Sequence, residues 1–456
     1  MLGLGAMVVS MMQTLVVPIL GLMQRNLHAT ASGASWLTTA TLLSAAVCTP
    51  LLGRLGDQHG AKATLVGVLG VTLAGSVLAA MTDSLPWLIA ARALQGASTA
   101  VFPLAQSVLR AELPRERLPG AMGALSGTLA FGNGLALAGA ALLTRGDTPD
   151  HRQVFWLSAG VSALTLVAVA AVVPRSRPGA GGRTDWPGAI ALAALLVLLL
   201  LPLSQGARWG WASAATLGCL AAAAALAALW ALVERRAHDP LVDMRMFVQR
   251  PVVYANLAGV LLGFAMFSQF LGVSALARLP AGPHGYGFGA SVLETSLVFL
   301  MPSAVVSLGA AQVAGILVRI MGPRRTLAAG AACGAAGFAA LAFAHGSVAG
   351  VVAAGALVGV AVSFGFAALP AVLLAAVPRD RTGVANGVNS VARSVGSALA
   401  GALSAALLTA PISGLPPESR FTACFVLGGG ALVLVGVIAL AGMADVRPLP
   451  EISPES

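Results

Sequence analysis

Charge is scarce in this chain. Only 26 of its 456 residues are Lys or Arg and 16 are Asp or Glu, which makes 9% charged residues, against about a quarter in soluble proteins. A soluble protein of this length would need many more charges to cover its surface. With 58% hydrophobic residues and a mean hydropathy of +0.89, the sequence predicts that its solvent is lipid.

Basic tracts, paired cysteines and metal-ligand clusters are also missing. The net charge is +10, but the Arg residues stand singly or in pairs between apolar runs, which leaves no basic segment for a nucleic acid backbone. No His and no carboxylate pair falls within a predicted span, so we expect no enzyme, no metal and no cofactor. Neither a disulfide framework nor a metal-ligand spacing connects the four cysteines, which all lie inside apolar runs: Cys48, Cys219, Cys333 and Cys424.

Long apolar runs dominate instead. A spanning helix needs about 20 apolar residues, and continuous Ala- and Leu-rich runs of this length recur, unlike the alternating strands of a β-barrel. The first run has no basic residue before Arg25 and exceeds the apolar part of a signal peptide, so we interpret it as a span. Division at Gly, Pro and Arg clusters predicts fourteen helices, at residues 3–24, 35–53, 63–82, 86–109, 118–143, 154–174, 187–205, 212–233, 252–277, 290–318, 324–343, 348–377, 385–409 and 421–443.

The basic residues are distributed unevenly over the predicted loops. With both termini in the cytoplasm, the inner loops contain eighteen of the 26 Lys and Arg residues and the outer loops six, while Arg92 and Arg393 fall inside helices. Lys and Arg favour cytoplasmic loops. We therefore expect a multi-pass protein of the plasma (inner) membrane with both termini cytoplasmic.

Two pairs of similar segments indicate an internal repeat. GRLGDQHGAKATL, from Gly53, matches GILVRIMGPRRTL, from Gly315, with Gly, Leu, Gly, Thr and Leu in register, and GALSGTLAFGNGLA, from Gly123, matches GVNSVARSVGSALA, from Gly387. Such repeats are common in transporters. The sequence predicts an all-α integral membrane protein with two pseudo-symmetric six-helix lobes, at residues 1–174 and 251–443, a two-helix insert within 175–250, and a cytoplasmic tail at 444–456.

These segments resemble a known family. The loop from Gly53 is similar to the signature loop of the major facilitator superfamily, and Arg92-Ala-Leu-Gln95-Gly96 is similar to its second motif. The helix count, DWPG at the start of the insert and PLVDMRMF after it resemble the fourteen-spanner drug/proton antiporter branch. The resemblance implies a secondary active transporter that exports a small organic molecule by alternating access, driven by an ion gradient, with protons as the coupling ion.

The signature loop has a physical argument of its own. Helices 35–53 and 63–82 must reverse direction within a short loop, so Gly53 and Gly60 are expected to adopt positive φ there. Asp57 then lies either in a solvated turn or, as the resemblance implies, in a latch that closes the lobes at the cytoplasmic side. The second copy has Arg in place of this Asp, so the latch is not symmetric. Its candidate residues are Gly53, Arg54, Asp57, Gly60 and Lys62 in the first copy and Gly315, Arg319, Gly322 and Arg324 in the second.

Four residues are candidates for coupling: Arg92, Gln95, Gly96 and Glu294. A charge as deep as Arg92, about 10 Å along its helix, must reach the interface, pair or face water. The resemblance implies that Arg92 and Gln95 face the central cavity and take part in proton or substrate coupling. Glu294 is the only carboxylate within a predicted span, where burial would suit it for proton exchange; simple placement at the membrane interface is the alternative.

A polar stripe runs along predicted helix 385–409. Asn386, Ser390, Arg393 and Ser397 recur at i, i+4, i+7 and i+11, with Asn389 beside them. Lipid does not accept such a face, so it must pack on another helix or line an aqueous route. Neighbouring glycines favour close helix contact as its role.

The substrate site is expected at the midplane between the lobes. Helices 3–24, 86–109, 252–277 and 348–377 should line it, and their apolar and amide groups suit a hydrophobic or weakly polar solute. The candidate cavity residues are Ser10, Gln13, Thr14, Asn256, Met266, Phe267, Gln269, Phe270, Ser363 and Phe364.

Two departures from the family pattern concern the coupling ion. Helix 3–24 has Met12 and Gln13 where the branch usually carries an Asp, and Gly132-Asn133-Gly134 lacks the usual Pro and Gly pair. Both weaken proton antiport and leave transport itself untouched. An uptake carrier or uniporter, and a non-transporting sensor or scaffold, stay as alternatives. The expected partners are a small molecule and the bilayer, not nucleic acid; a monomer suffices for transport, and the sequence leaves the oligomeric state open.

The first testable prediction concerns topology. A cysteine replacing Pro149, in a chain stripped of its native cysteines, should react with an impermeant thiol reagent added to whole cells, because segment 145–152 is expected outside. Labelling only after lysis would reject this orientation.

Overall fold

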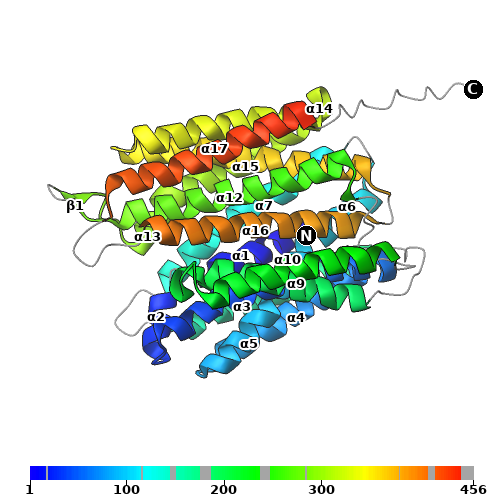
Figure 1. Ribbon diagram of the computed structural model, residues 1–456, viewed down its shortest axis with the longest axis horizontal. Helices are drawn as coiled ribbons and strands as arrows, with labels where there is room; N and C mark the ends of the chain where they lie inside the picture. Colours follow the sequence, from blue (N-terminus) through cyan, green and yellow to red (C-terminus); the bar gives the residue numbers. More distant parts are fainter. Residues whose placement is uncertain are drawn as a thin grey trace, which may run out of the picture.

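The computed structural model describes residues 1–16, 19–114, 117–143, 150–174, 186–236, 247–282, 285–378, 381–408 and 416–442. The described chain is almost wholly helical, with helices aligned along the long axis of one bundle (Figure 1). The N-terminal lobe contains α1 (Leu2–Thr14), α2 (Leu20–Asn26), α3 (Ala31–His59), α4 (Ala61–Met81), α5 (Leu85–Gly96), the 3-10 turn η1 (Ala97–Ala100), α6 (Val101–Glu112), α7 (Leu118–Leu143) and α8 (His151–Val172).

The insert and the C-terminal lobe follow. The insert is formed by α9 (Trp186–Trp209) and α10 (Ala214–Arg236). The C-terminal lobe contains α12 (Arg250–Arg278), a short antiparallel hairpin of β1 (Ala281–Gly282) and β2 (Gly285–Tyr286), α13 (Val292–Glu294), the π-helical turn η2 (Thr295–Leu300), α14 (Met301–Phe343), α15 (Val348–Ala376), α16 (Thr382–Leu408) and α17 (Glu418–Gly442).

The membrane-spanning character of the helices is confirmed. Twelve helices of the described chain are long and apolar enough to cross a bilayer. The longest of these, Val292–Phe343, contains the non-helical residue Gly322, at which two helices meet. Helix α1 is apolar but, taken by itself, is too short to cross a bilayer. The all-α membrane class is therefore confirmed, and the count of fourteen crossings stays a prediction.

The turns of the internal repeat differ from expectation at one glycine. We expected positive φ at Gly53 and Gly60, but α3 continues to His59, and Gly60 alone separates it from α4, with φ 97°. Gly322, which matches Gly60 in the second copy, also has positive φ, at 83°. The two copies thus share a turn whose glycine has positive φ, a backbone conformation that other residues rarely adopt. Gly53 is helical, so the positive φ expected there was wrong.

Two further boundaries depart from the predictions. The expected helix 3–24 consists of α1 and α2, which are separate helices in the described residues. The hairpin after α12 had not been anticipated; there the Tyr286 hydroxyl donates to the Pro416 carbonyl and its ring contacts Phe421 edge-on, with centroids 5.7 Å apart. The hairpin therefore holds the start of α17 against the end of α12.

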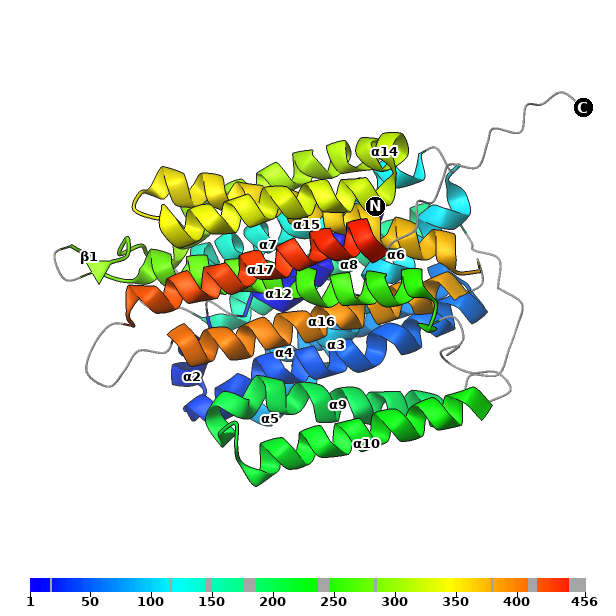
Figure 2. The ribbon, with the colours of Figure 1, turned by 45° about the horizontal axis from the view of Figure 1, so that its top comes forward.

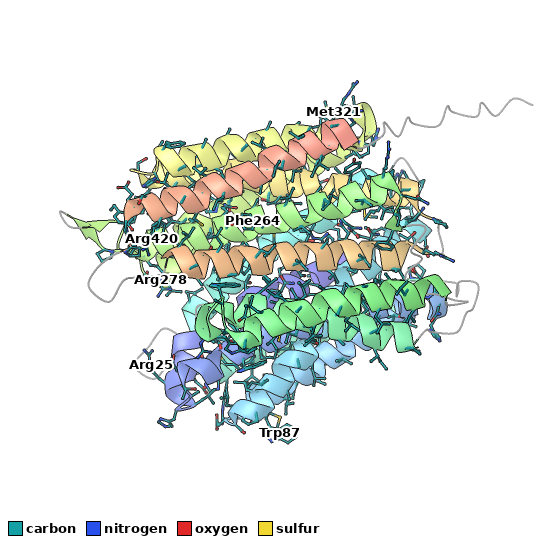
Figure 3. The ribbon with its side chains drawn as sticks, viewed as in Figure 1. Arg25, Trp87, Phe264, Arg278, Met321 and Arg420 are labelled. Carbon is teal, nitrogen blue, oxygen red and sulfur yellow. The ribbon has the colours of Figure 1, made fainter. Side chains whose placement is uncertain are left out.

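Each lobe has its own buried apolar core. One cluster joins α1, α3 to α6, α7 and α8, and a second joins α12, α14, α15 and α17. Outward-facing Leu, Val and Trp side chains remain exposed on α8, α10, α14 and α17, as lipid-facing surfaces require. Figure 3 shows Arg25, Arg278 and Arg420 at one end of the bundle and Met321 at the other. Three arginines expected in outer loops thus lie at the same end.

The insert lies against both lobes. Figure 2 shows α9 and α10 side by side at the edge of the bundle next to α3 and α16. Gln205 on α9 donates from Nε2 to Thr39 Oγ1 at 3.0 Å, and Arg208 donates from Nη1 to Ser35 Oγ at 2.7 Å. Leucines of α9 pack with Val384 of α16 in a separate apolar cluster. The insert is therefore hydrogen-bonded to the N-terminal lobe and in apolar contact with the C-terminal lobe.

Helices α12 and α16 approach each other through glycines. A Cβ added at Gly396 would lie 1.8 Å from the Val260 carbonyl oxygen, and one at Gly263 would lie 2.1 Å from the Arg393 carbonyl oxygen. Both partners are backbone atoms, which cannot give way without moving a helix. Close contact of this kind is typical of membrane helices.

A second prediction follows from this contact. Gly396→Ala should lower the thermal stability of the purified protein, with a loss of roughly 1–3 kcal/mol for an overpacked interior, because the new methyl group overlaps a carbonyl of α12. Gly309→Ala is the matched control, since no atom lies within 4 Å of its added Cβ. Equal melting temperatures for the two variants in detergent would contradict the contact.

Candidate substrate cavity and inter-lobe contacts

A cavity of about 390 Å³ lies between the two lobes and the insert. It reaches Ser35, near the start of α3, and Ala405, near the end of α16, and both positions lie away from the end of the bundle at which Asp57 is found. The lining residues come from α1, α3, α5, α7, α9, α12 and α16: Gln13, Thr14, Ser35, Thr38, Thr39, Thr41, Leu42, Ala45, Arg92, Asn133, Leu203, Ser204, Met266, Phe267, Phe270, Leu271, Ser394, Ser397, Ala398, Gly401, Ala402 and Ala405.

A smaller cavity of about 90 Å³ shares Asn133, Met266 and Phe270 with the first and extends between α7, α12, α14 and α15. Gln269 and Phe366 belong to its wall. The shared residues make the two cavities neighbours across the side chains of α7 and α12.

Six of the ten expected cavity residues line these cavities: Gln13, Thr14, Met266, Phe267, Gln269 and Phe270. The other four expected positions are corrected. Ser10 donates to the Met7 carbonyl, Asn256 accepts from Asn389, Ser363 donates to the Ser307 carbonyl, and Phe364 is buried against Gly330. Ser10 bonds within its own helix, whereas Asn256, Ser363 and Phe364 are used between helices, which helical position alone does not reveal.

The sequence analysis missed two walls of the cavity. Ser35, Thr38, Thr39 and Leu42 follow i, i+3, i+4 and i+7 spacing on α3. This hydroxyl-rich face could have been found from its helical period. Leu203 and Ser204 of the insert gave no such signal, because only the docking of α9 on α3 places them at the cavity.

Arg92 is buried, with 2% of its surface exposed, and belongs to the cavity wall. Its Nε donates to the Leu37 carbonyl at 3.1 Å, Nη2 to the Met12 carbonyl at 2.8 Å and Nη1 to Gln95 Oε1 at 2.6 Å. Gln95 in turn donates from Nε2 to Ser76 Oγ at 2.9 Å. Arg92 therefore neither extends to the interface nor pairs with a described acid, and its position at the cavity agrees with the placement expected for it.

Gly96 has a packing role in this region. A Cβ at this position would lie 2.6 Å from the Thr41 carbonyl oxygen. Thr41 Oγ1 donates to the Arg92 carbonyl at 3.1 Å, and Ser44 Oγ donates to the Ala93 carbonyl at 2.5 Å. The absent side chain lets α3 and α5 come close enough for these bonds.

The polar stripe of α16 serves mainly in helix contact. Asn389 donates from Nδ2 to the Ala255 carbonyl at 2.9 Å and to Asn256 Oδ1 at 3.2 Å, and Ser397 Oγ donates to the Gly263 carbonyl at 3.3 Å. These bonds join α16 to α12, as expected from the neighbouring glycines. Ser397 also lines the cavity, whereas Asn386 is buried and its Nδ2 has no hydrogen-bond partner among the described residues.

Arg393 leaves the stripe toward the lobe interface. Its guanidinium donates to Asn389 Oδ1 at 2.8 Å and to Ser390 Oγ at 3.2 Å. It also lies over the rings of Phe366 and Phe102, at 4.7 and 5.9 Å from their centroids. Since Phe102 belongs to α6 and Phe366 to α15, this cation–π contact joins the lobes.

Asp57 lies at the beginning of α16. Its Oδ1 accepts from the Gly383 N–H and its Oδ2 from the Val384 N–H, both at 3.1 Å. A carboxylate at this position satisfies open N–H groups of the first helical turn and interacts favourably with the helix dipole. A Cβ at Gly53 would lie 2.8 Å from the Gly383 carbonyl oxygen, so Gly53 serves close approach of α3 to α16.

A second contact between the lobes lies at the same end. Arg110 on α6 donates from Nη2 to the Leu374 carbonyl at 2.9 Å and from Nη1 to the Thr382 hydroxyl. Arg54 is partly buried, and its Nε has no hydrogen-bond partner among the described residues. We name the Asp57 and Arg110 contacts together the inter-lobe clamp. The sequence analysis had missed Arg110.

The second copy of the loop behaves differently. Arg319 is exposed, and Arg324 donates to the Leu440 carbonyl of α17, inside its own lobe. The predicted asymmetry of the two copies agrees with these placements. Whether Gly315, Gly322 and these two arginines act in conformational change stays a prediction.

Glu294 is not in the position that a coupling role requires. It is exposed, and it forms a capping box with Ser291: its carboxylate accepts from the Ser291 N–H at 2.7 Å, while Ser291 Oγ accepts from the Glu294 N–H at 3.2 Å. The expected burial is therefore wrong, because Glu294 lies in the first turn of a helix that begins at Val292, where its carboxylate caps the helix start. Its part in coupling stays an untested prediction that now lacks its structural basis.

These features define a class of protein. Two helical lobes, each with its own core, meet at a clamp at one end, and a cavity between them reaches toward the other end. This is the arrangement of a carrier whose cavity lies between two structural repeats.

Comparison with known proteins identifies the family. Residues 2–277 and 257–456 each match the model of the Major Facilitator Superfamily. The chain therefore belongs to this superfamily; it is a multi-pass membrane transporter and not an enzyme.

Two relatives are antibiotic export proteins by name. The chain is 28% identical over 426 residues to the tetracenomycin C resistance and export protein of Streptomyces glaucescens, covering 91% of this chain and 76% of that protein. It is 32% identical over 315 residues to the cephamycin export protein CmcT of Amycolatopsis lactamdurans, covering 66% of this chain and 62% of that protein.

A solved structure shows the same fold. The crystal structure of the human organic anion transporter MFSD10 (TETRAN) superposes with a TM-score of 0.68, covering 96% of this chain and 97% of that chain, at 13% sequence identity. At this identity the likeness concerns the fold alone.

The clamp generates a third prediction. Asp57→Asn should slow transport while leaving membrane insertion intact. The Asn side chain has one acceptor oxygen, so it cannot accept from both N–H groups, and the substitution removes the negative charge at the start of α16. A cap of this kind contributes about 1 kcal/mol. Asp83→Asn is the control: Asp83 pairs with Arg152 on the exposed surface, where such pairs contribute little. Substrate flux should be compared at equal protein amounts. Equal flux in wild type and Asp57→Asn would return Asp57 to the solvated-turn interpretation.

Proposed function

We propose that this transporter exports a hydrophobic or weakly polar small organic molecule, a drug or metabolite, from the cell by alternating access. The observation that carries the proposal is the cavity itself. Its wall combines the apolar side chains of Met266, Phe267 and Phe270 with hydroxyl and amide groups from α1, α3, α7 and α16. Such a lining suits an organic solute, whereas a sugar would call for more polar groups. The names of the two antibiotic export relatives support the same substrate class and direction.

The inter-lobe clamp supports a specific state of the cycle. With Asp57 bonded to α16 and Arg110 bonded to α15 and α16, the lobes are held together at one end while the cavity reaches toward the other. The proposed orientation places the clamp in the cytoplasm. The structure then corresponds to a carrier closed toward the cytoplasm, and transport requires the clamp to open as the cavity changes sides.

The coupling ion is part of the proposal. An ion gradient, with protons as the first candidate, is proposed as the driving force on the resemblance to the drug/proton antiporter branch. One observation favours uniport as the second candidate: the described residues that line either cavity include no carboxylate. A proton antiporter needs a group that loses and regains a proton within the cycle, and Arg92 keeps its proton at physiological pH.

The fourth prediction tests export and coupling together. An efflux-deficient bacterial host that expresses the chain should grow at higher concentrations of some compounds of a lipophilic toxic panel, and the Asp57→Asn variant should lose much of this gain. No gain on any compound, with the protein present in the membrane, would contradict export.

A compound found in this way then decides the coupling. Its flux is measured in proteoliposomes with and without an imposed ΔpH. Dependence on ΔpH in wild type would support proton antiport, and independence would support uniport. Glu294→Gln should leave the dependence unchanged, because Glu294 is an exposed helix cap; its loss would restore Glu294 as the coupling group.

A further inference from the structure

Arg92 is a buried cation whose contacts are all neutral. Its three bonds go to two backbone carbonyls and one amide oxygen, although a guanidinium has five N–H donors. Among the described residues, ion pairs such as His151–Asp150, Arg152–Asp83 and His345–Glu418 lie at helix ends, and none of these three includes Arg92. A charge removed from water without a counter-ion is costly. The protein therefore maintains an uncompensated positive charge at the cavity wall.

Arg393 adds a second cation on the opposite lobe. Its contacts are the oxygens of Asn389 and Ser390 and the faces of two Phe rings, none of which carries a full negative charge. Its neighbour in sequence, Ser394, lines the cavity, as does Ser397 one turn further on. Arg393 itself does not line either cavity, but Phe366, whose ring it covers, belongs to the wall of the smaller one. A second buried guanidinium therefore lies behind the wall, on the lobe opposite Arg92.

No described acid faces this charge across the cavity. Arg92 is the only charged residue among the described residues that line either space. Two carboxylates that the sequence suggested for function are engaged elsewhere: Asp57 accepts from the start of α16, and Glu294 accepts from Ser291. The low-dielectric walls focus the field of Arg92 into the cavity. A cationic solute would be repelled there, and an anionic one would supply the missing counter-charge.

The rest of the wall fits the remainder of such a solute. Ser35, Thr38, Thr39 and Ser394 present hydroxyl groups that can donate to acidic oxygens, while Met266, Phe267 and Phe270 present apolar and aromatic surface on α12. We propose that the substrate is an organic anion, with an apolar or aromatic body and a carboxylate or phenolate group drawn toward Arg92.

This inference rests on the proposed export function and narrows its substrate class. It also concerns the absence of a carboxylate among the described residues that line the two cavities. An anion leaving a cell with a negative interior is driven outward by the membrane potential, so a carrier of this kind needs no titrating carboxylate in its cavity.

The test compares two dyes that share a xanthene body and differ in charge. Fluorescein is an anion and rhodamine 6G is a cation at neutral pH. Binding of each to the purified protein in lipid nanodiscs is measured by fluorescence polarisation. Wild type should bind fluorescein at least about tenfold more tightly than rhodamine 6G. Arg92→Gln should reduce this ratio by about tenfold or more, and Arg92→Lys, which keeps the charge, should retain most of it.

A second pair of variants does not depend on the fold tolerating a change at Arg92. Ser204 lines the cavity on α9 and bonds only locally, to the Leu201 carbonyl at 2.9 Å. Ser204→Asp should shift the preference toward rhodamine 6G by about tenfold, because a carboxylate then lies in the wall of the cavity that Arg92 also lines. Ser204→Asn has nearly the same shape without the charge and should keep the wild-type preference.

The outcomes separate this inference from the export proposal. Tighter or equal binding of rhodamine 6G by wild type, or no binding of fluorescein, would overturn the anion inference. An unchanged preference in Ser204→Asp would overturn it as well, since the charge of the wall would then not select the ligand. If the anion inference fails in this way but cells that express the chain are protected against neutral or cationic compounds, the export proposal is still supported. If the cells are protected against no compound, the export proposal is contradicted.

Discussion

The bilayer offers no hydrogen-bond partners, and this constraint governs where every polar group of the structure lies. Arg92 shows it most clearly. Its guanidinium donates hydrogen bonds to the Leu37 carbonyl of α3, to the Met12 carbonyl of α1 and to the amide oxygen of Gln95 in its own helix. A single side chain therefore connects three helices of the N-terminal lobe. Because a charge exposed to lipid would cost several kcal/mol, these helices must turn this side chain inward, and the cavity inherits its positive charge.

The same constraint gives α16 its central place. Its polar face bonds to α12 through Asn389 and Ser397, the N–H groups of its first turn donate to Asp57 of α3, and its apolar residues pack with α9. Glycines bring α16 close enough to α12 and α3 for backbone atoms to take part. A helix that carries contacts to both lobes and to the insert is well placed to transmit movement between them, since displacement of α16 changes the clamp, the Arg393 stacking and the cavity wall together.

Cavity and clamp occupy different ends of the same interface. At one end the lobes meet through charge-assisted bonds from Asp57 and Arg110, which can form and break as units. Toward the other end, hydroxyl groups of α3 and side chains of α9, α12 and α16 surround open space. The insert contributes to this wall directly, which gives the two additional helices a place in the substrate site as well as at the lipid-facing edge.

The sequence by itself determined the membrane class, most helix positions, the repeat and the depth of Arg92, because these follow from apolar run length, helical period and the cost of a charge in lipid. It also predicted the positive φ of Gly60, whereas the same prediction for Gly53 was wrong, and the positive φ of Gly322 in the second copy came from the structure. Only the tertiary structure decided the partners. It placed Asp57 on α16 instead of in water, turned Asn256 and Ser363 toward neighbouring helices, brought Ser204 of the insert to the cavity, and left Glu294 at an exposed cap. Helical period fixes which side chains share a face, but the helix that covers that face is chosen by contacts between segments far apart in the chain.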